Sequence, residues 1–233
     1  MTPGRLAFLL ELVGVREEIA VPLPQRVCAA CVEATSVTGA ALALVSHGGQ
    51  GGTIAASDAR IRSVDDEQFT FGEGPGISAF ATGEVLESDL ATSRAVSAWP
   101  AFTRHAQAAG IGAAFGFPLL RSGLRVGSLD LYRDTAGALT GDELGDARAL
   151  AVIATVVVTE IQSHAPNAGE QLHPDLERGM GRAIVHQATG MVMVQLGVTI
   201  AEAIILLRAY AFSHERPIFE IAADIVARRL RLE

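Results

Sequence analysis

The chain has 233 residues, of which 49% are hydrophobic and 19% are charged, and it carries a formal net charge of −8. This composition excludes a chain that is disordered throughout, and the acidity excludes a basic surface over the whole chain that would hold nucleic acid by charge alone. All 18 basic residues are arginine, which excludes a P-loop lysine, a protein-kinase lysine and Schiff-base chemistry.

The N-terminal part of the chain changes from helical to strand patterns. Apolar residues recur at helical spacing over 6–13 and 23–37, which predicts two helices. Residues 39–46 then have the pattern of a buried strand, and a cluster of turn-forming residues allows 53–57 to return beside it. We therefore expect two helices followed by a β-hairpin.

The middle of the chain predicts a second hairpin. Residues 69–77 predict a short strand that runs into a glycine-rich turn, and a short helix follows over 77–82. Residues 111–120 and 124–133 predict two longer strands, joined by a tight turn at 121–123. Apolar and polar residues alternate in the last strand, as in a strand whose two faces differ in burial.

A long helix follows this hairpin. Thr140 and Glu143 form a capping-box pattern, so the helix begins there and continues to about Ser163. Its apolar positions are separated by three or four residues: Leu144, Ala147, Ala151, Ala154, Val158 and Ile161. Such a row either covers the sheet of its own domain or forms the seam of a dimer, and the pattern leaves both open.

The rest of the chain is a linker and a helical domain. Residues 164–175 are rich in Pro, Gly and polar residues, which separates a domain over 1–163 from one over 176–233. Three helices are predicted in the second domain: Leu176–Leu196, Thr199 to near His214, and Pro217 to about Leu230. The expected core consists of Ile184, Ala188, Met191, Ala203, Leu207, Tyr210, Ile221, Ala222 and Ile225.

The region from about Leu23 to Gln162 resembles a GAF domain. The segments that carry the resemblance are FGEGPGISAFATGE (71–84), SAWPAF (97–102), FPLLRSGLRVGSLDLYR (117–133) and TGDELGDARALA (140–151), in that order. The resemblance implies an α+β domain with a central antiparallel sheet and helices on both sides. It also implies a small-molecule pocket on one face of the sheet in many members, and frequent dimers through the flanking helices.

The segment from about Gly181 to Leu230 resembles an ANTAR domain. The residues that carry this resemblance are HQATGMVMVQLGVTIAEAIILLRAYA (186–211) and RPIFEIAADIVARRL (216–230). The resemblance implies an all-α domain of three helices that binds hairpin RNA and prevents premature termination of transcription. Thr189 stands where members of the family often carry lysine.

The candidate RNA-binding residues lie in this segment. Gln187 and Thr189 are expected to contact base edges, and Ala188 and Gly190 are small either because RNA approaches the backbone or because helices cross there. The candidates for phosphate or stacking contacts are Arg182, Arg208 and Arg216, whereas Arg228, Arg229 and Arg231 are interpreted as favourable charges at a helix C-terminus.

Three residues of the GAF-like region are candidates for a ligand cavity. Trp99, Phe102 and His105 could line one, although the alternative is that Trp99 fills the core and His105 lies on a helix surface. Cys28 and Cys31 form a CxxC pattern inside a predicted helix, which favours core packing over a redox pair. We expect no catalytic residues, no metal site and no cofactor.

These patterns predict a signal-responsive regulator that is not an enzyme. The expected partners are hairpin RNA in nascent transcripts, an unidentified small-molecule or signal ligand, and a second copy of the chain as a homodimer. No apolar run is long enough to span a bilayer, so we expect a cytoplasmic protein. From Glu170 onward seven Arg stand against eight acidic residues, so a protein-interaction regulator without RNA binding is the alternative, and a thiol-dependent enzyme is a third hypothesis.

Overall fold

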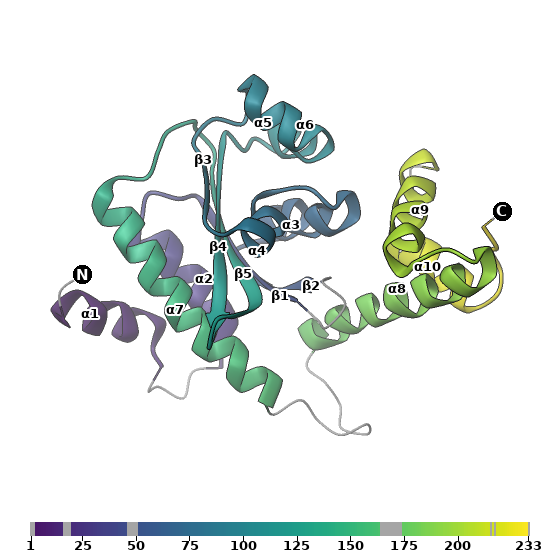
Figure 1. Cartoon of the computed structure of the whole chain (residues 1–233). Coiled ribbons are helices and arrows are strands. Elements are labelled where there is room, and N and C mark those ends of the chain that lie inside the picture. Colours follow the sequence, from purple (N-terminus) through teal and green to yellow (C-terminus); the bar gives the residue numbers. More distant parts are fainter. Residues whose placement is uncertain are drawn as a thin grey trace. The chain divides into compact units, whose positions relative to one another are not determined.

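The computed structural model describes residues 3–15, 20–45, 51–163, 174–214, 216 and 218–232 (Figure 1). The chain divides into two compact units, residues 1–170 and 171–233. The first unit combines a sheet with helices and the second is helical. The α+β class and the all-α C-terminal region expected from the sequence are therefore confirmed.

A five-stranded antiparallel sheet forms the centre of the N-terminal unit. Its strand order is β2-β1-β5-β4-β3. The strands are β1 (Gly39–Val45), β2 (Gly51–Ala56), β3 (Val85–Glu87), β4 (Ala113–Arg121) and β5 (Leu124–Arg133). The predicted turn between β4 and β5 is confirmed, because Ser122 and Gly123 both adopt positive φ, 49° and 80°, as a two-residue hairpin turn of type I′ requires.

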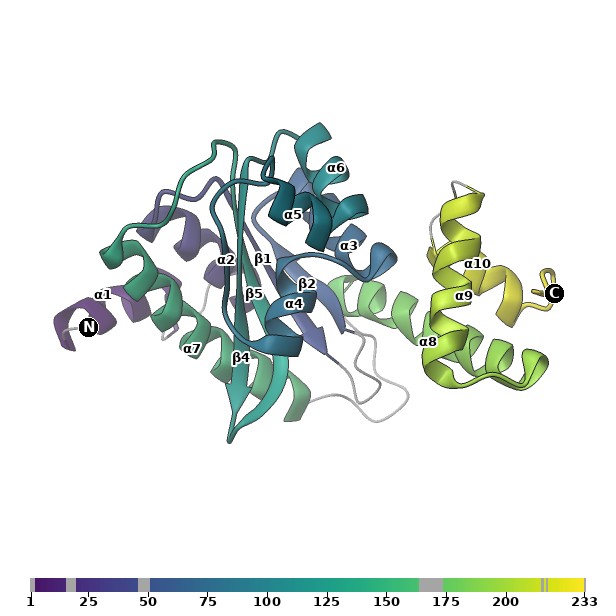
Figure 2. The same cartoon turned by 45° about the horizontal axis from the view of Figure 1, so that its top comes forward.

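Helices cover both faces of this sheet (Figure 2). On one face lie α1 (Pro3–Val13), α2 (Leu23–Ala34) and α7 (Gly141–Ser163). On the other face lie α3 (Ala59–Phe71), α4 (Pro75–Thr82), α5 (Ser93–Ala98) and α6 (Pro100–Ala108). Each face has its own hydrophobic cluster, so the sheet separates two hydrophobic cores.

The side chains of strand β5 point alternately to the two faces of the sheet. Leu129 and Leu131 are fully buried in the cluster beneath α7. Asp130 hydrogen-bonds with Gln68 of α3, and Tyr132 belongs to the cluster on that side. This is the period-two alternation that the sequence predicted for the strand.

The expected strand at 69–77 is wrong, because its first residues are the last turn of α3. The helix begins at Asp58, whose carboxylate accepts a hydrogen bond from the Ile61 amide at 2.8 Å, and it ends at Gly72 with φ 71°. Its buried residues follow helical spacing: Ile61, Val64, Asp65, Gln68 and Phe69. Two of these five are polar, so the segment lacks the apolar stripe that marks a helix in a sequence.

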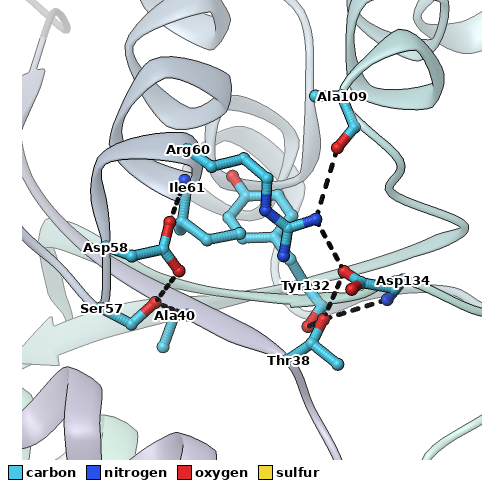
Figure 3. A network of polar contacts seen from close by, with 9 residues as sticks. All are labelled: Thr38, Ala40, Ser57, Asp58, Arg60, Ile61, Ala109, Tyr132 and Asp134. Atoms are coloured by element: carbon cyan, nitrogen blue, oxygen red, sulfur yellow. Dashed lines mark hydrogen bonds and ion pairs between the residues drawn. The ribbon is translucent and has the colours of Figure 1, made fainter.

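A polar network fixes the start of α3 to the end of β5 (Figure 3). The Arg60 guanidinium donates to the Asp134 carboxylate at 2.9 Å and to the Ala109 carbonyl at 3.3 Å. Thr38 donates to the same carboxylate at 2.6 Å. The network therefore ties the first turn of α3 to a carboxylate that lies 74 residues further along the chain.

The long helix α7 begins and ends as predicted. Its capping box is present, since the Glu143 amide donates to Thr140 Oγ1 at 3.3 Å and the Thr140 amide donates to the Glu143 carboxylate at 2.7 Å. The predicted row packs inside the unit: Ala147, Ala151, Ala154 and Val158 are buried, and Leu144 and Ile161 pack against them. The row therefore covers its own sheet and is not free to form a dimer seam.

Three helices form the C-terminal unit: α8 (Pro174–Leu196), α9 (Ile200–Ser213) and α10 (Ile218–Val226). Gly197 ends α8 with φ 66°, and the capping box of Thr199 and Glu202 starts α9. Helix α10 ends at Val226, before the predicted Leu230. Most of the predicted linker, 164–173, and Pro217 lie outside the described residues.

The core of this unit agrees with the prediction at Ala188 and differs from it by one position at two other places on α8; Tyr210, also expected in the core, is half-buried. Its buried side chains include Val185, Ala188, Thr189, Val192, Ala203, Ile204, Leu207, Ala211, Ile218, Ile221, Ala222 and Ile225. Val185 and Val192 occupy places expected for Ile184 and Met191, which are half-buried. Across the described ranges no single helix is long and apolar enough to cross a membrane; one pair, 187–196 and 200–213, passes by length and composition together but is bent by 105°.

Candidate nucleic-acid interface

A groove of about 810 Å³ lies between the outer face of α8 and the chain that follows α10. Its lining consists of Gln187, Gly190, Met191, Val194, Gln195, Ile225, Arg228, Leu230 and Arg231. Among the described residues, the lining contains two guanidinium groups and no carboxylate, whereas its unit as a whole is nearly neutral. Met191, Val194, Ile225 and Leu230 make part of the lining apolar, which suits a flat aromatic group.

The turn after α10 places the two arginines in the groove. Arg228 has φ 57°, and the Arg229 amide donates to the Asp224 carbonyl at 2.7 Å, as in a helix that ends with a left-handed residue. The chain then runs back to α8, where Gln195 Nε2 donates to the Leu232 carbonyl at 2.8 Å. Because both ends of this segment are fixed, Arg228 and Arg231 are held beside α8.

Gly190 lies on the α8 side of the groove. A Cβ atom built there meets no atom within 4 Å among the described residues. Packing within this unit therefore does not require glycine, and a glycine inside a helix costs roughly 1 kcal/mol relative to alanine. Of the two explanations offered by the sequence, close helix crossing is not supported, and approach of an external group to the backbone remains.

The structure brings only some of the predicted RNA-binding residues together. Gln187 and Gly190 line the groove. Ala188 and Thr189 are buried in the helical core, and the Thr189 hydroxyl donates to the Val185 carbonyl at 2.7 Å. The base contact expected from the Thr189 side chain is thus contradicted, because the helical period turns it away from the groove. For Ala188, burial favours the alternative that the residue is small because helices pack closely there.

Two of the predicted arginine contacts, Arg208 and Arg216, are not among the residues that line the groove. Arg216 forms ion pairs with Glu220 at 3.5 Å and with Asp224 at 2.8 Å. Arg208 is half-buried, and this burial lowers the pKa of its guanidinium. The side chain of Arg182 lies outside the described residues. Arg228 and Arg231 are expected from the sequence to be charges at a helix end. They line the groove beside α8, because the chain turns at the left-handed residue Arg228.

Trp99 and Phe102 are core residues on the α3 side of the sheet. Phe102 is fully buried, its ring lies 5.9 Å from that of Trp99, and Trp99 Nε1 donates to Ser78 Oγ at 2.9 Å. His105 packs edge-on against Phe71, with 6.2 Å between ring centroids. The structure therefore favours the packing alternative for these residues over the lining of an open cavity.

A buried polar cluster lies between α3 and β5. The Asp65 carboxylate accepts hydrogen bonds from Thr53 at 2.7 Å, from Tyr132 at 2.7 Å and from Gln68 at 2.8 Å. The Asp130 carboxylate lies 3.3 Å from the same Gln68 amide nitrogen. Burial raises the pKa of both carboxyl groups, and the charge of Asp65 raises that of Asp130 further.

The two buried carboxyl groups of this cluster accept different numbers of hydrogen bonds. Asp130 accepts a hydrogen bond from Ser128 at 2.9 Å on Oδ2, whereas its buried Oδ1 has no hydrogen-bond partner among the described residues. Three donors stabilise the charge of Asp65, whereas Asp130 accepts fewer hydrogen bonds and lies in the field of Asp65. The pKa of Asp130 is therefore raised further above its ordinary value than that of Asp65.

Cys28 and Cys31 are both fully buried free thiols. Burial raises the pKa of Cys28 well above its ordinary value and raises that of Cys31 to about 12. A thiol reacts as the thiolate, so neither is activated as a nucleophile. Over the described ranges, no group of three or more His, Cys, Asp or Glu residues could hold a metal ion.

Thiol labelling tests this interpretation. In native protein at pH 8, a disulfide reagent is expected to label neither cysteine within minutes, whereas both should react at once in denaturant. Cys28→Ala/Cys31→Ala is expected to retain RNA binding, since alanine fills part of the same buried space. Rapid labelling of the folded chain would contradict the structural role and revive the thiol-dependent enzyme.

Residues 177–226 match the ANTAR domain family. The match extends from the first part of α8 to the end of α10, and it identifies this segment rather than the whole chain. No curated protein matches the sequence.

The N-terminal unit shares its fold with solved GAF domains. The GAF domain of a phosphoenolpyruvate-protein phosphotransferase from Coxiella burnetii has a TM-score of 0.53 at 14% identity, covering 71% of this chain and 99% of that one. The corresponding domain from Acinetobacter has a TM-score of 0.51 at 12% identity, covering 72% and 100%. A free methionine-R-sulfoxide reductase from Neisseria meningitidis, solved with its substrate, has a TM-score of 0.47 at 16% identity, covering 70% and 95%.

The chain thus carries a unit of the GAF fold followed by an ANTAR domain. The second of these is a domain of regulatory proteins, and the first shares only its fold with the solved GAF domains. The expected order of the two domains is confirmed.

Proposed function

We propose that this chain binds hairpin RNA through the groove of its ANTAR domain and thereby causes transcription antitermination. ANTAR domains bind RNA, and the segment that matches this family supplies the α8 and α10 residues of the groove, whereas Arg228, Leu230 and Arg231 follow directly after it. The observation that carries the proposal for this site is the combination of Gly190, which has open space in front of it, with two arginines on the opposite wall.

The groove offers the three kinds of contact that an RNA loop needs. Unpaired bases stack on apolar side chains and guanidinium planes, at about 1–3 kcal/mol per base. Met191 and the arginines supply such surfaces, and the exposed amide of Gln187 pairs with a base edge. Arg228 and Arg231 also neutralise phosphates, which explains binding by a unit without net positive charge.

Binding of the hairpin provides the antitermination step. A protein that binds one RNA fold and not its alternative stabilises that fold by RT ln(1 + [protein]/Kd). At a hundredfold excess over Kd this amounts to about 2.7 kcal/mol, enough to shift a balanced pair of hairpins almost completely. The terminator that competes for the same nucleotides is then not formed.

The N-terminal unit is proposed to gate this activity in the cytoplasm. A small-molecule ligand or other signal would shift it between two states, and α7 would carry the change toward the helical unit. The shift can be no larger than the difference in ligand affinity between the two states. Trp99, Phe102 and His105 remain candidates for a cavity that opens in one of them.

Salt-dependent RNA binding tests the proposal. The full chain is expected to bind a hairpin with a six-base loop, more weakly as salt rises. Arg228→Ala/Arg231→Ala should lower the affinity at least tenfold and reduce the salt slope by about 1 for each phosphate that the variant no longer neutralises. Arg229→Ala is the matched control, because this guanidinium is held by Asp224 at 2.8 Å and lies outside the groove lining.

A protein partner instead of RNA is the second candidate. The near-neutral charge of the helical unit and the exposed apolar side chains Ile205 and Phe212 on α9 favour it. RNA binding that is absent at low salt, or unchanged in Arg228→Ala/Arg231→Ala, would count against the groove. A salt-insensitive protein complex that Ile205→Glu abolishes would then support the second candidate.

A further inference from the structure

A second groove lies next to the proposed RNA groove in the helical unit. It has a volume of about 550 Å³ and is lined by Leu196, Leu206, Ala209, Tyr210, Ser213, Arg231 and Leu232. Among the described residues, its lining contains one guanidinium group, one aromatic ring and no carboxylate. We call it the second groove, and we call the groove lined by Gln187 and Gly190 the first groove.

The chain after α10 separates the two grooves. Leu230 lines the first groove and Leu232 lines the second, whereas Arg231 between them lines both. At the end of α8, Gln195 lines the first groove and Leu196 lines the second. The hydrogen bond of 2.8 Å from Gln195 to the Leu232 carbonyl fixes the segment in this place. The two grooves are therefore neighbouring parts of one surface, with Arg231 at their boundary.

The Arg231 guanidinium is accessible to a ligand from either groove. Its side chain is exposed, and no described residue forms a hydrogen bond or an ion pair with it. The nearby Arg229 is instead held by Asp224 at 2.8 Å. A guanidinium at the boundary between two grooves suits the phosphate that joins two successive nucleotides, because the bases of an unpaired loop can be splayed apart into separate sites.

Tyr210 supplies an aromatic surface in the second groove. Its ring stacks on that of His214, with 3.9 Å between the ring centroids and 17° between the ring planes. His214 Nδ1 lies 2.9 Å from the Tyr210 carbonyl oxygen and 2.9 Å from Ser213 Oγ. The imidazole therefore covers one face of the tyrosine ring, and the rest of that ring borders the groove. An aromatic ring that is already ordered loses little conformational entropy when a base stacks on it.

We infer that the second groove binds one unpaired base of the hairpin RNA, stacked on Tyr210, while the neighbouring nucleotide occupies the first groove. The phosphate between these two nucleotides then lies at Arg231. Stacking accepts any base, because every base has a flat π surface. The second groove therefore contributes affinity and a requirement for an unpaired nucleotide, without a strong preference for its sequence. This inference rests on the proposed function, since it concerns a further contact of the same RNA.

A cycle of protein and RNA changes tests the contact in the full chain. Tyr210→Leu is expected to weaken binding of a hairpin with a six-base loop about tenfold, because the stacking surface is lost. The slope of the salt dependence should not change, since no phosphate contact is removed. The measurement is then repeated with hairpins that each have one abasic loop nucleotide. For one of these hairpins Tyr210→Leu should have almost no effect, because the base that stacks on Tyr210 is already missing.

Two further variants control for effects on the fold. Tyr210→Phe retains the ring and should restore most of the affinity that Tyr210→Leu loses. Phe212→Leu makes the same aromatic-to-leucine change on α9 at a side chain that is 57% exposed and lines neither groove. It should bind the hairpin as the wild type does. Circular dichroism checks that each variant keeps its helical content.

The possible results separate this inference from the proposed function. Hairpin binding that is weakened by Arg228→Ala/Arg231→Ala but not by Tyr210→Leu would overturn the inference and leave the proposed function intact. A loss in Tyr210→Leu that is equal for every abasic hairpin would also overturn it, because Tyr210 would then act only through the fold of the helical unit. A wild-type chain that binds no hairpin RNA at low salt would overturn both.

Discussion

Gly190→Leu is expected to lower the affinity for hairpin RNA at least tenfold while it raises the melting temperature of the helical unit. A Cβ atom at this position meets no atom of the described residues within 4 Å, and the position lines the groove, so we expect the leucine side chain to extend into open space. Replacing a glycine inside a helix improves helix propensity by about 0.8–1 kcal/mol. The added side chain projects into the groove and displaces a base whose stacking contributes about 1–3 kcal/mol.

The variant is expected to lose RNA affinity while it gains stability, and misfolding cannot produce this combination. A variant that simply misfolds loses stability and binding together. Gly145→Leu is the matched control, since Gly145 also lies inside a helix, α7, and also has open space at its Cβ position. It should gain stability and keep RNA affinity. RNA binding by Gly190→Leu at wild-type strength would remove the groove as the RNA site.

Asp130→Asn is expected to stabilise the N-terminal unit at pH 8 and to flatten the dependence of its stability on pH. The pKa of Asp130 is raised in the folded state by burial and by the charge of Asp65. The stability that the protonated acid contributes is fully present below about pH 4, the ordinary pKa of aspartate, and is lost as the pH rises through the raised folded pKa. The uncharged amide has no such loss.

The size of the effect follows from the cost of burying the charged carboxylate with one oxygen, Oδ1, that has no hydrogen-bond partner among the described residues. Such a cost is about 1–3 kcal/mol, which corresponds to several degrees in melting temperature for a unit of this size. Denaturant unfolding from pH 4 to pH 9 measures it. Asp66→Asn, which changes a half-buried aspartate on α3 next to Asp65, is the control. A variant Asp130→Asn that is less stable than wild type at every pH would show that the carboxylate is charged and held by a partner.

Local signals in the sequence were sufficient for most of the fold. The β4–β5 hairpin, the capping boxes of α7 and α9 and the end of α8 at Gly197 depend on neighbouring residues and were all predicted. Helix α3 was missed, because Asp65 and Gln68 are polar yet buried, and their partners Thr53 and Tyr132 come from distant strands. The hydrophobic pattern of a sequence does not reveal a buried polar network of this kind.

The candidate RNA site was predicted only in part, for a geometric reason. Gln187 and Gly190 were identified by the family resemblance, and they do share one face of α8. Which face is exposed depends on a helical register that differed by one position from the expected core, and this buries Thr189. The position of Arg228 in the groove could not be predicted, because a left-handed conformation at an arginine has no sequence signal comparable to that of glycine.

The two faces of strand β5 also bear on how a signal could travel through the molecule. Asp130 belongs to the buried polar cluster, and its immediate neighbours Leu129 and Leu131 lie under α7. A rigid strand cannot shift one residue without shifting the next, so an event that displaces the Asp130 backbone also disturbs the packing on which α7 rests. The polar cluster and the packing beneath α7 are then separated by one peptide unit of β5, and no series of intermediate side chains is needed to connect them.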